Sequence, residues 1–114
     1  MYRSANDRTV NSKCIRNGIG ETQMIQILNG ADEMYGKGRM FNEMILAPGN
    51  SIGEHMHSGD NEIFYFLSGT GEYNDNGTVV TVRQGDTVVC SDGQTHSLKN
   101  TGKEPLRFIA LILY

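Results

Sequence analysis

The three histidines of this chain fall in two short segments, one of which also holds a carboxylate at close spacing. His55 and His57 are separated by Met56, Glu62 follows after a polar turn, and His96 comes later in the chain. Side chains alternate faces along a strand, so His55 and His57 would point to one side and Met56 to the other. The turn after His57 would let the next strand bring Glu62 back beside them.

These four residues form a donor set with defined chemistry. Three imidazoles and one carboxylate suit a divalent transition metal. We therefore expect one ion (Mn, Fe, Ni, Co, Cu or Zn) to be bound by His55, His57, Glu62 and His96. The competing interpretation is three surface histidines with no common role, and the residues around the four donors argue against it.

Glycines spaced around these donors carry a resemblance to a known family. The pattern G-x5-H-x-H-x4-E-x6-G is matched at every fixed position from Gly49 to Gly69. A second pattern, G-x5-P-x-G-x2-H-x3-N, is matched from Gly85 to Asn100, except that Ser91 stands where proline is usual. These are the two motifs of the cupin superfamily, and the chain resembles a small single-domain member of it.

The resemblance implies a fold and a site. The expected fold is all-β: a single-domain jelly-roll barrel, or double-stranded β-helix, with the metal held inside one open end by the four donors. Four protein ligands would leave coordination positions open to a bound molecule, as in catalytic metal sites. A divalent ion bound by one carboxylate keeps a positive charge, which favours small anionic ligands such as dicarboxylates and hydroxy acids.

Cupins carry out many reactions, so two functions stay open. One is a small metalloenzyme, a dioxygenase, decarboxylase or isomerase, acting on a small anionic or polar metabolite. The other is a non-catalytic sensor or accessory protein that binds a metal or a small molecule. No additional His or Lys is placed near the motifs to serve as general acid or base, and Glu54, Asp60 and Tyr73 have no role that spacing alone assigns.

The composition agrees with one small domain rich in tight turns. The chain has 114 residues, 14 of them glycine, and a formal net charge of −3. An acidic balance argues against nucleic acid or an anionic membrane as partner. No stretch approaches the length of a membrane helix and the first 20 or so residues lack an apolar signal segment. We therefore expect a cytoplasmic protein in which Cys14 and Cys90 are reduced.

We divide the chain into an N-terminal arm or edge strand, residues 1–21, and a barrel domain, residues 22–114. The arm is locally basic, and we interpret it as a solvated tail. Alternating apolar residues between turn signals predict strands at the two histidine segments and at residues 22–28, 40–46, 62–67, 71–74, 79–82, 87–90 and 106–114.

Two of these strands suggest self-association. Residues 22–28 would form an exposed apolar edge unless another strand covers them. Residues 106–114 are apolar on both faces and need cover on both. Two-fold pairing, with or without exchange of the N-terminal strands, would bury both surfaces, and small cupins resemble one another in forming dimers. We expect a homodimer.

Overall fold

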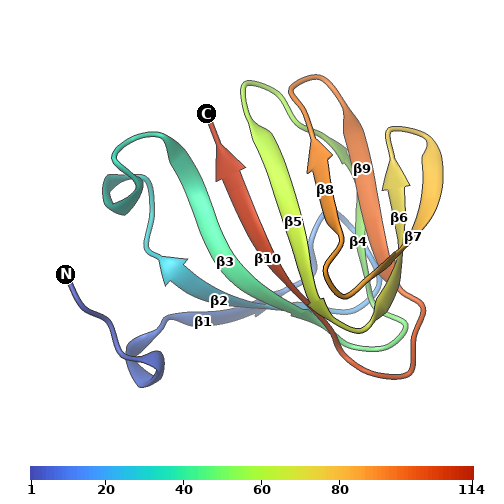
Figure 1. The fold of residues 1–114 in the computed structure, drawn as a ribbon, viewed down its shortest axis with the longest axis horizontal. Helices are drawn as coiled ribbons and strands as arrows, with labels where there is room; N and C mark the ends of the chain where they lie inside the picture. The colour runs from blue at the N-terminus through green and yellow to red at the C-terminus, as the bar shows by residue number, and fades with distance from the viewer.

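The chain folds as two antiparallel β-sheets that face each other (Figure 1). The structure, a computed structural model, describes residues 1–114. It contains two short 3₁₀ turns, η1 (Ala5–Asp7) and η2 (Asp32–Met34), and ten strands: β1 (Val10–Lys13), β2 (Thr22–Leu28), β3 (Gly38–Leu46), β4 (Ser51–Met56), β5 (Asn61–Ser68), β6 (Thr70–Asp75), β7 (Thr78–Arg83), β8 (Thr87–Cys90), β9 (Thr95–Asn100) and β10 (Leu106–Leu113). The predicted all-β fold is confirmed, and no helix has the length and hydropathy needed to cross a membrane.

The strand order is that of a jelly roll. The larger sheet runs β1-β2-β3-β10-β5-β8 and the smaller runs β4-β9-β6-β7. No ladder of hydrogen bonds joins the two sheets, so the barrel is open along its edges instead of being one continuous cylinder. The sheets are held together by the side chains between them.

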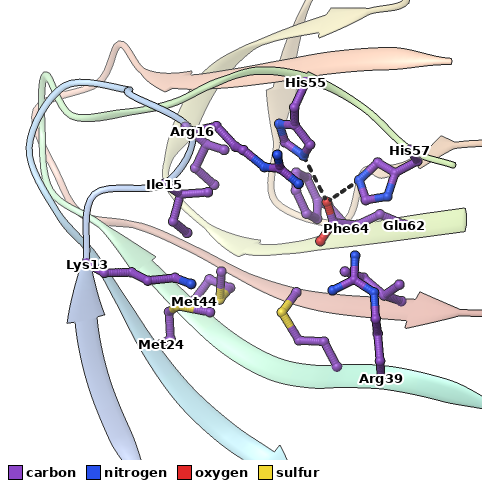
Figure 2. Close-up of a pocket in the computed structure, with 13 residues that line it drawn as sticks. Lys13, Ile15, Arg16, Met24, Arg39, Met44, His55, His57, Glu62 and Phe64 are labelled. Atoms are coloured by element: carbon purple, nitrogen blue, oxygen red, sulfur yellow. Dashed lines mark hydrogen bonds and ion pairs between the residues drawn. The ribbon is translucent and has the colours of Figure 1, made fainter. Parts of the chain in front are cut away.

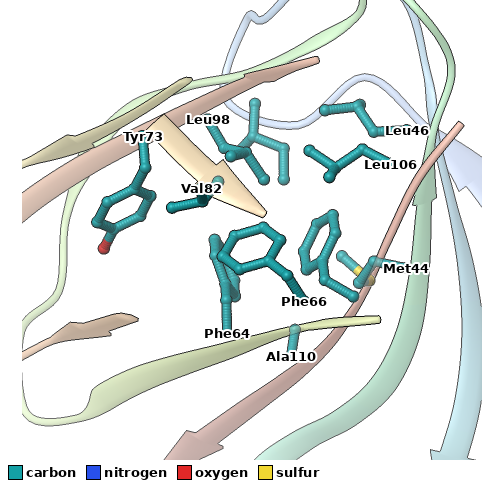
Figure 3. Packing of buried hydrophobic residues seen from close by; sticks show 11 residues of the cluster. Met44, Leu46, Phe64, Phe66, Tyr73, Val82, Leu98, Leu106 and Ala110 are labelled. Atoms are coloured by element: carbon teal, nitrogen blue, oxygen red, sulfur yellow. The ribbon is translucent and has the colours of Figure 1, made fainter. Parts of the chain in front are cut away.

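The core fills the space between the two sheets (Figure 3). Its eleven buried members come from both sheets: Met44, Leu46, Ile52, Phe64, Phe66, Tyr73, Val82, Leu98, Leu106, Phe108 and Ala110. On β5 the side chains alternate as predicted: Glu62, Phe64 and Phe66 are buried, whereas Tyr65 and Leu67 are exposed. Glu62 therefore lies on the same inner face as the aromatic core.

Residues 10–13 form the edge strand of the larger sheet, one of the two forms expected for residues 1–21, so the interpretation of the segment as a solvated tail is wrong. Strand β1 pairs with β2, and all four of its residues are exposed. Two of the arm's basic residues form ion pairs, Arg3 with Glu33 and Arg8 with Glu43. Because β1 covers β2, the edge that residues 22–28 would have exposed is already paired within one chain.

The C-terminal strand lies in the middle of the larger sheet, between β3 and β5. Its inward-facing side chains, Phe108, Ala110 and Ile112, are buried. Ile109 and Leu111 on the outer face are half-buried, and Leu113 is 37% exposed. The expected cover on both faces is therefore not supplied within one chain, and the homodimer stays a prediction.

Candidate metal centre

The four predicted residues meet at one end of the space between the sheets. His55 near the end of β4 is the cross-strand partner of His96 on β9, and Met56 points outward with 58% exposure. His57 follows the end of β4 and stays fixed to the chain before β9, because its amide donates to the carbonyl of Gln94 at 3.0 Å. Glu62 reaches the group from β5 of the other sheet, so the site bridges both sheets.

The donor atoms of the four residues converge closely, and Figure 2 shows three of the residues, His55, His57 and Glu62. One potential donor atom from each residue lies within 4.8 Å of the others. The Nε2 atom of His96 is 3.2 Å from Nε2 of His57, 3.1 Å from Nε2 of His55 and 3.0 Å from Oε1 of Glu62. Oε1 of Glu62 is also 3.1 Å from Nε2 of His57 and 3.9 Å from Nε2 of His55.

A partner for each Nδ1 atom sets the direction of its ring. His55 Nδ1 is 2.8 Å from the carbonyl oxygen of Gly53, which can only accept a hydrogen bond. His57 Nδ1 is 2.8 Å from the carboxylate of Asp60. Both rings therefore carry a proton on Nδ1, which leaves the Nε2 lone pair free to face the centre in the neutral ring.

His96 has a third kind of partner. The Tyr73 hydroxyl oxygen lies 2.8 Å from His96 Nδ1 and can accept a hydrogen bond from it. Both side chains are buried, and the ring of His96 stacks on Phe64 with centroids 5.2 Å apart. Phe64 thus packs against the face of this imidazole, and Tyr73 bonds to its Nδ1 atom.

This donor arrangement fits a divalent ion. Ligands at neighbouring positions around a metal with bonds of about 2.1 Å are about 3.0 Å apart, close to four of the five donor distances above. Lone pairs at such separations repel one another unless a cation or a proton lies between them. Imidazole nitrogens oriented by carboxylate, carbonyl and hydroxyl partners are the arrangement found behind metal-binding histidines.

Burial and hydrogen bonding shift the pKa values of three of the four residues. Burial would raise the pKa of the Glu62 carboxyl, but hydrogen bonds with His57 and His96 outweigh it and leave that pKa below its usual range. The same contact with Glu62, aided by Asp60, raises the pKa of His57. Burial lowers the pKa of His55. The carboxylate is therefore held in its charged form, as a metal ligand requires.

A cavity of about 140 Å³ opens beside the cluster. Besides three of the donor residues it is lined by apolar side chains and by three cations, Lys13, Arg16 and Arg39, which we call the cationic mouth (Figure 2). Arg39 donates to Asp60 at 2.9 Å, and burial, which would raise the pKa of Asp60, is outweighed by its bonds to His57 and Arg39. The cavity wall contains no carboxyl or imidazole group beyond His55, His57 and Glu62.

Several of these contributions were not assigned from the sequence. Asp60 and Tyr73 had been noted only as neighbours of the motifs, and the structure shows them bonded to His57 and His96. Glu54 lies away from the cluster, in the wall of a second cavity on the smaller sheet. The residues of the cationic mouth come from parts of the chain before the first motif, which no local signal connected to the site.

The motif positions outside the donor set shape turns, as expected. The Asn100 side chain accepts from Gly102 N and donates to the carbonyls of Leu46 and Glu104. Where proline is usual, the amide of Ser91 donates to the Gln94 side chain at 2.9 Å, which closes that turn by other means. Cys90 is buried and free, and Cys14 is exposed and free.

Comparison with known proteins agrees with this geometry. A family model described as a cupin domain matches residues 42–112, more than half of the chain and all four converging residues. The chain belongs to the cupin family. The match begins within β3, so the arm, β2 and all three residues of the cationic mouth lie outside it.

Three matches illustrate the similarity, two of them over most of the matched protein's length. An oxalate-binding protein of Thermotoga maritima is 41% identical over 99 residues, which is 87% of this chain and 81% of that protein. The crystal structure of a predicted oxalate decarboxylase from Thermotoga maritima superposes with a TM-score of 0.93 at 38% identity, covering 99% of this chain and 98% of the other. A tetracenomycin polyketide synthase protein of Streptomyces glaucescens is 31% identical over 64 residues, 56% of this chain and 43% of its own length.

Proposed function

We propose that this cupin binds one divalent transition metal through His55, His57, Glu62 and His96 and uses it to bind a small chelating carboxylate. The observation that carries the proposal is the convergence of three Nε2 atoms and one carboxylate oxygen on a common point. At least two of the rings are oriented by acceptors that require a proton on Nδ1. A bound divalent ion supplies a Lewis-acid centre with positions open to ligand oxygens.

The size and charge of the cavity support a short anion as the ligand. A volume of about 140 Å³ has room for only a handful of non-hydrogen atoms. A divalent ion balanced by Glu62 alone keeps one positive charge, which a chelating carboxylate would neutralise. The name of the relative from Thermotoga maritima, an oxalate-binding protein, points to oxalate as the first ligand to test.

The residues of the cavity wall favour a protein that binds the carboxylate over an enzyme that converts it. All its imidazole and carboxyl groups belong to the metal-binding set, and the remaining polar side chains are the three cations. No carboxyl or imidazole group is left to move a proton to or from a bound molecule, and among the three cations only Lys13 is of a type that acts as a general acid or base. Decarboxylation is the second candidate, because the related structure is described as a predicted oxalate decarboxylase.

The experiment begins with metal analysis of the purified protein and of the His57→Ala variant. We expect about one ion per chain in the unaltered protein and a strong loss in the variant, because one ligand is missing. Equal metal content in the two proteins would refute the assignment of His57.

Calorimetric titration of oxalate into metal-loaded and metal-stripped protein then tests the ligand. Binding that requires the metal supports the proposal, and binding to neither form refutes it. Incubation of the loaded protein with oxalate, followed by detection of formate and carbon dioxide, separates the two candidates. Saturable binding without product supports a binding protein, and product formed at a steady rate supports the decarboxylase.

A further inference from the structure

The connection between β1 and β2, residues 14–21, is hydrogen-bonded along β4 beside the cluster. The carbonyl of Ile15 accepts from Gly53 N at 3.1 Å, and the carbonyl of Ile19 accepts from Ser51 N at 2.8 Å. Two glycines permit this approach: a Cβ on Gly53 would lie 1.9 Å from the carbonyl oxygen of Arg16, and a Cβ on Gly18 would lie 2.1 Å from the carbonyl oxygen of Ser51. The backbone of this connection therefore forms a fixed wall next to His55.

The turn within this wall directs Arg16 into the cavity. Arg16 and Asn17 both have left-handed backbone conformations, with φ of 54° and 59°. Such a conformation costs a non-glycine residue about 1–2 kcal/mol, so the surrounding contacts must enforce it. In Figure 2 the guanidinium of Arg16 extends from the connection toward His55 and the carboxylate of Glu62.

Two of the three cations at this mouth have no partner in the protein. Arg39 is paired with Asp60 at 2.9 Å. Neither Arg16 nor Lys13 makes an ion pair or a side-chain hydrogen bond, which is also true of basic side chains elsewhere such as Arg83; their position in the cavity wall is what distinguishes these two. The protein as a whole has a net charge of −3. The excess of positive charge at this cavity therefore comes from where the fold places three basic residues, and not from a basic amino-acid composition.

We infer that Arg16, with Lys13 beside it, selects ligands with a second carboxylate by binding the carboxylate oxygens that are turned away from the metal-binding cluster. The inference rests on the proposed function and deepens it from small carboxylates in general to dicarboxylates. A guanidinium suits this role because its fixed, parallel donors can span the two free oxygens that a chelated dicarboxylate turns away from the metal. Arg16 and Lys13 are exposed, so an entering anion can reach them, and the apolar neighbours Ile15, Met24 and Met44 line the same cavity.

The test compares Arg16→Gln with a matched control, Arg83→Gln. Arg83 pairs with Thr70 at one end of β6, and His96 pairs with Asp75 at the other end. The rise along β6 places Arg83 about 17 Å from His96. Each metal-loaded protein is titrated with oxalate and with glycolate, a chelating anion that has a single carboxylate. Metal content is measured on the same samples.

For Arg16→Gln we expect oxalate affinity to fall about ten- to a hundredfold, the size of a lost charged hydrogen bond. Glycolate affinity should fall much less, metal content should stay at the level of the unaltered protein, and Arg83→Gln should change neither affinity. Arg16→Lys keeps the charge without the two-pronged geometry and should restore part of the oxalate affinity.

The outcomes separate this inference from the proposed function. If the unaltered metal-loaded protein binds oxalate and Arg16→Gln binds it equally well, the role of Arg16 is wrong while the proposed function stands. An equal decrease for oxalate and glycolate would also overturn the role in selection. If the unaltered protein holds metal but binds neither anion, the proposed function fails and the inference fails with it.

Discussion

Asp60 offers the sharpest test of how the site is organised, because it contacts His57, one of the four proposed metal ligands, without being a proposed ligand itself. Its side chain is 7% exposed and accepts from His57 Nδ1 at 2.8 Å and from Arg39 Nε at 2.9 Å. In Asp60→Asn, one amide oxygen can still accept from His57. The amide nitrogen would then face the Nε–H of Arg39, so two donors would oppose each other.

The size of the effect follows from these contacts. In the unaltered protein the negative charge of Asp60 fixes the ring of His57 and makes Nε2 of that ring a better donor to a metal. The substitution removes this charge. Loss of such a supporting partner typically costs 10- to 100-fold in metal affinity, or about 1.4–2.7 kcal/mol. We therefore expect Asp60→Asn, which keeps all four donors, to bind one ion per chain at high metal concentration, but with a metal dissociation constant raised about 10- to 100-fold.

Competition with a chromogenic chelator at fixed pH measures the constant. Asp32→Asn is the matched control, since Asp32 lies on η2 and its side chain has no hydrogen bond or ion pair. A dissociation constant within twofold of the unaltered protein for both variants would refute the reasoning, because His57 would then be oriented by its backbone alone. A tenfold rise for both variants would point to net charge instead of the contact with His57.

Three further expectations concern stability and assembly. Asn100→Ala removes three buried or half-buried hydrogen bonds and should lower the free energy of unfolding by about 2–4 kcal/mol in urea titrations, with exposed Asn11→Ala as the control that leaves it unchanged. Bonding to Arg3 lowers the pKa of Glu33 to about 2 from 4.5. This pair therefore stabilises the fold above about pH 4.5 and loses its effect as the pH falls toward 2. Glu33→Gln should lower the melting temperature at neutral pH and have the same melting temperature as the unaltered protein near pH 2. Light scattering at micromolar concentration should give twice the 12.6 kDa chain mass, and a mass near 12.6 kDa would contradict the homodimer.

The donor set could be predicted because its geometry is nearly local. His55 and His57 share a face by the period of a strand, and Glu62 follows on the next strand after a short turn. Only His96 needed information from far along the chain, and the second motif supplied it. Alternation on β5 likewise predicted Phe64 and Phe66 as core residues.

The partners of the donors could not be predicted because they depend on how distant strands pair. Tyr73 reaches His96 only because β6 runs beside β9, with Tyr73 opposite Leu98. Arg39 reaches Asp60 from β3, in a register set by the whole larger sheet. The Gly53 carbonyl is available to His55 where the pairing of β4 with β9 shifts register, between Ile52 and His55.

The N-terminal segment shows why composition was misleading there. Its polar, glycine-containing sequence is typical of a tail, yet Gly18 allows its backbone to contact β4 closely enough to exclude even a methyl group. The family motifs define a metal-binding cluster that many cupins with different ligands can share. Two unpaired cations held over that cluster by a segment outside the family match would distinguish this chain from others with the same four donors. Ligand choice would then depend on residues 13–16 and metal binding on residues 55–96. Substitutions at residues 13–16 should change ligand affinity and leave metal content unchanged, whereas loss of one of the four donors should reduce both, because ligand binding requires the metal.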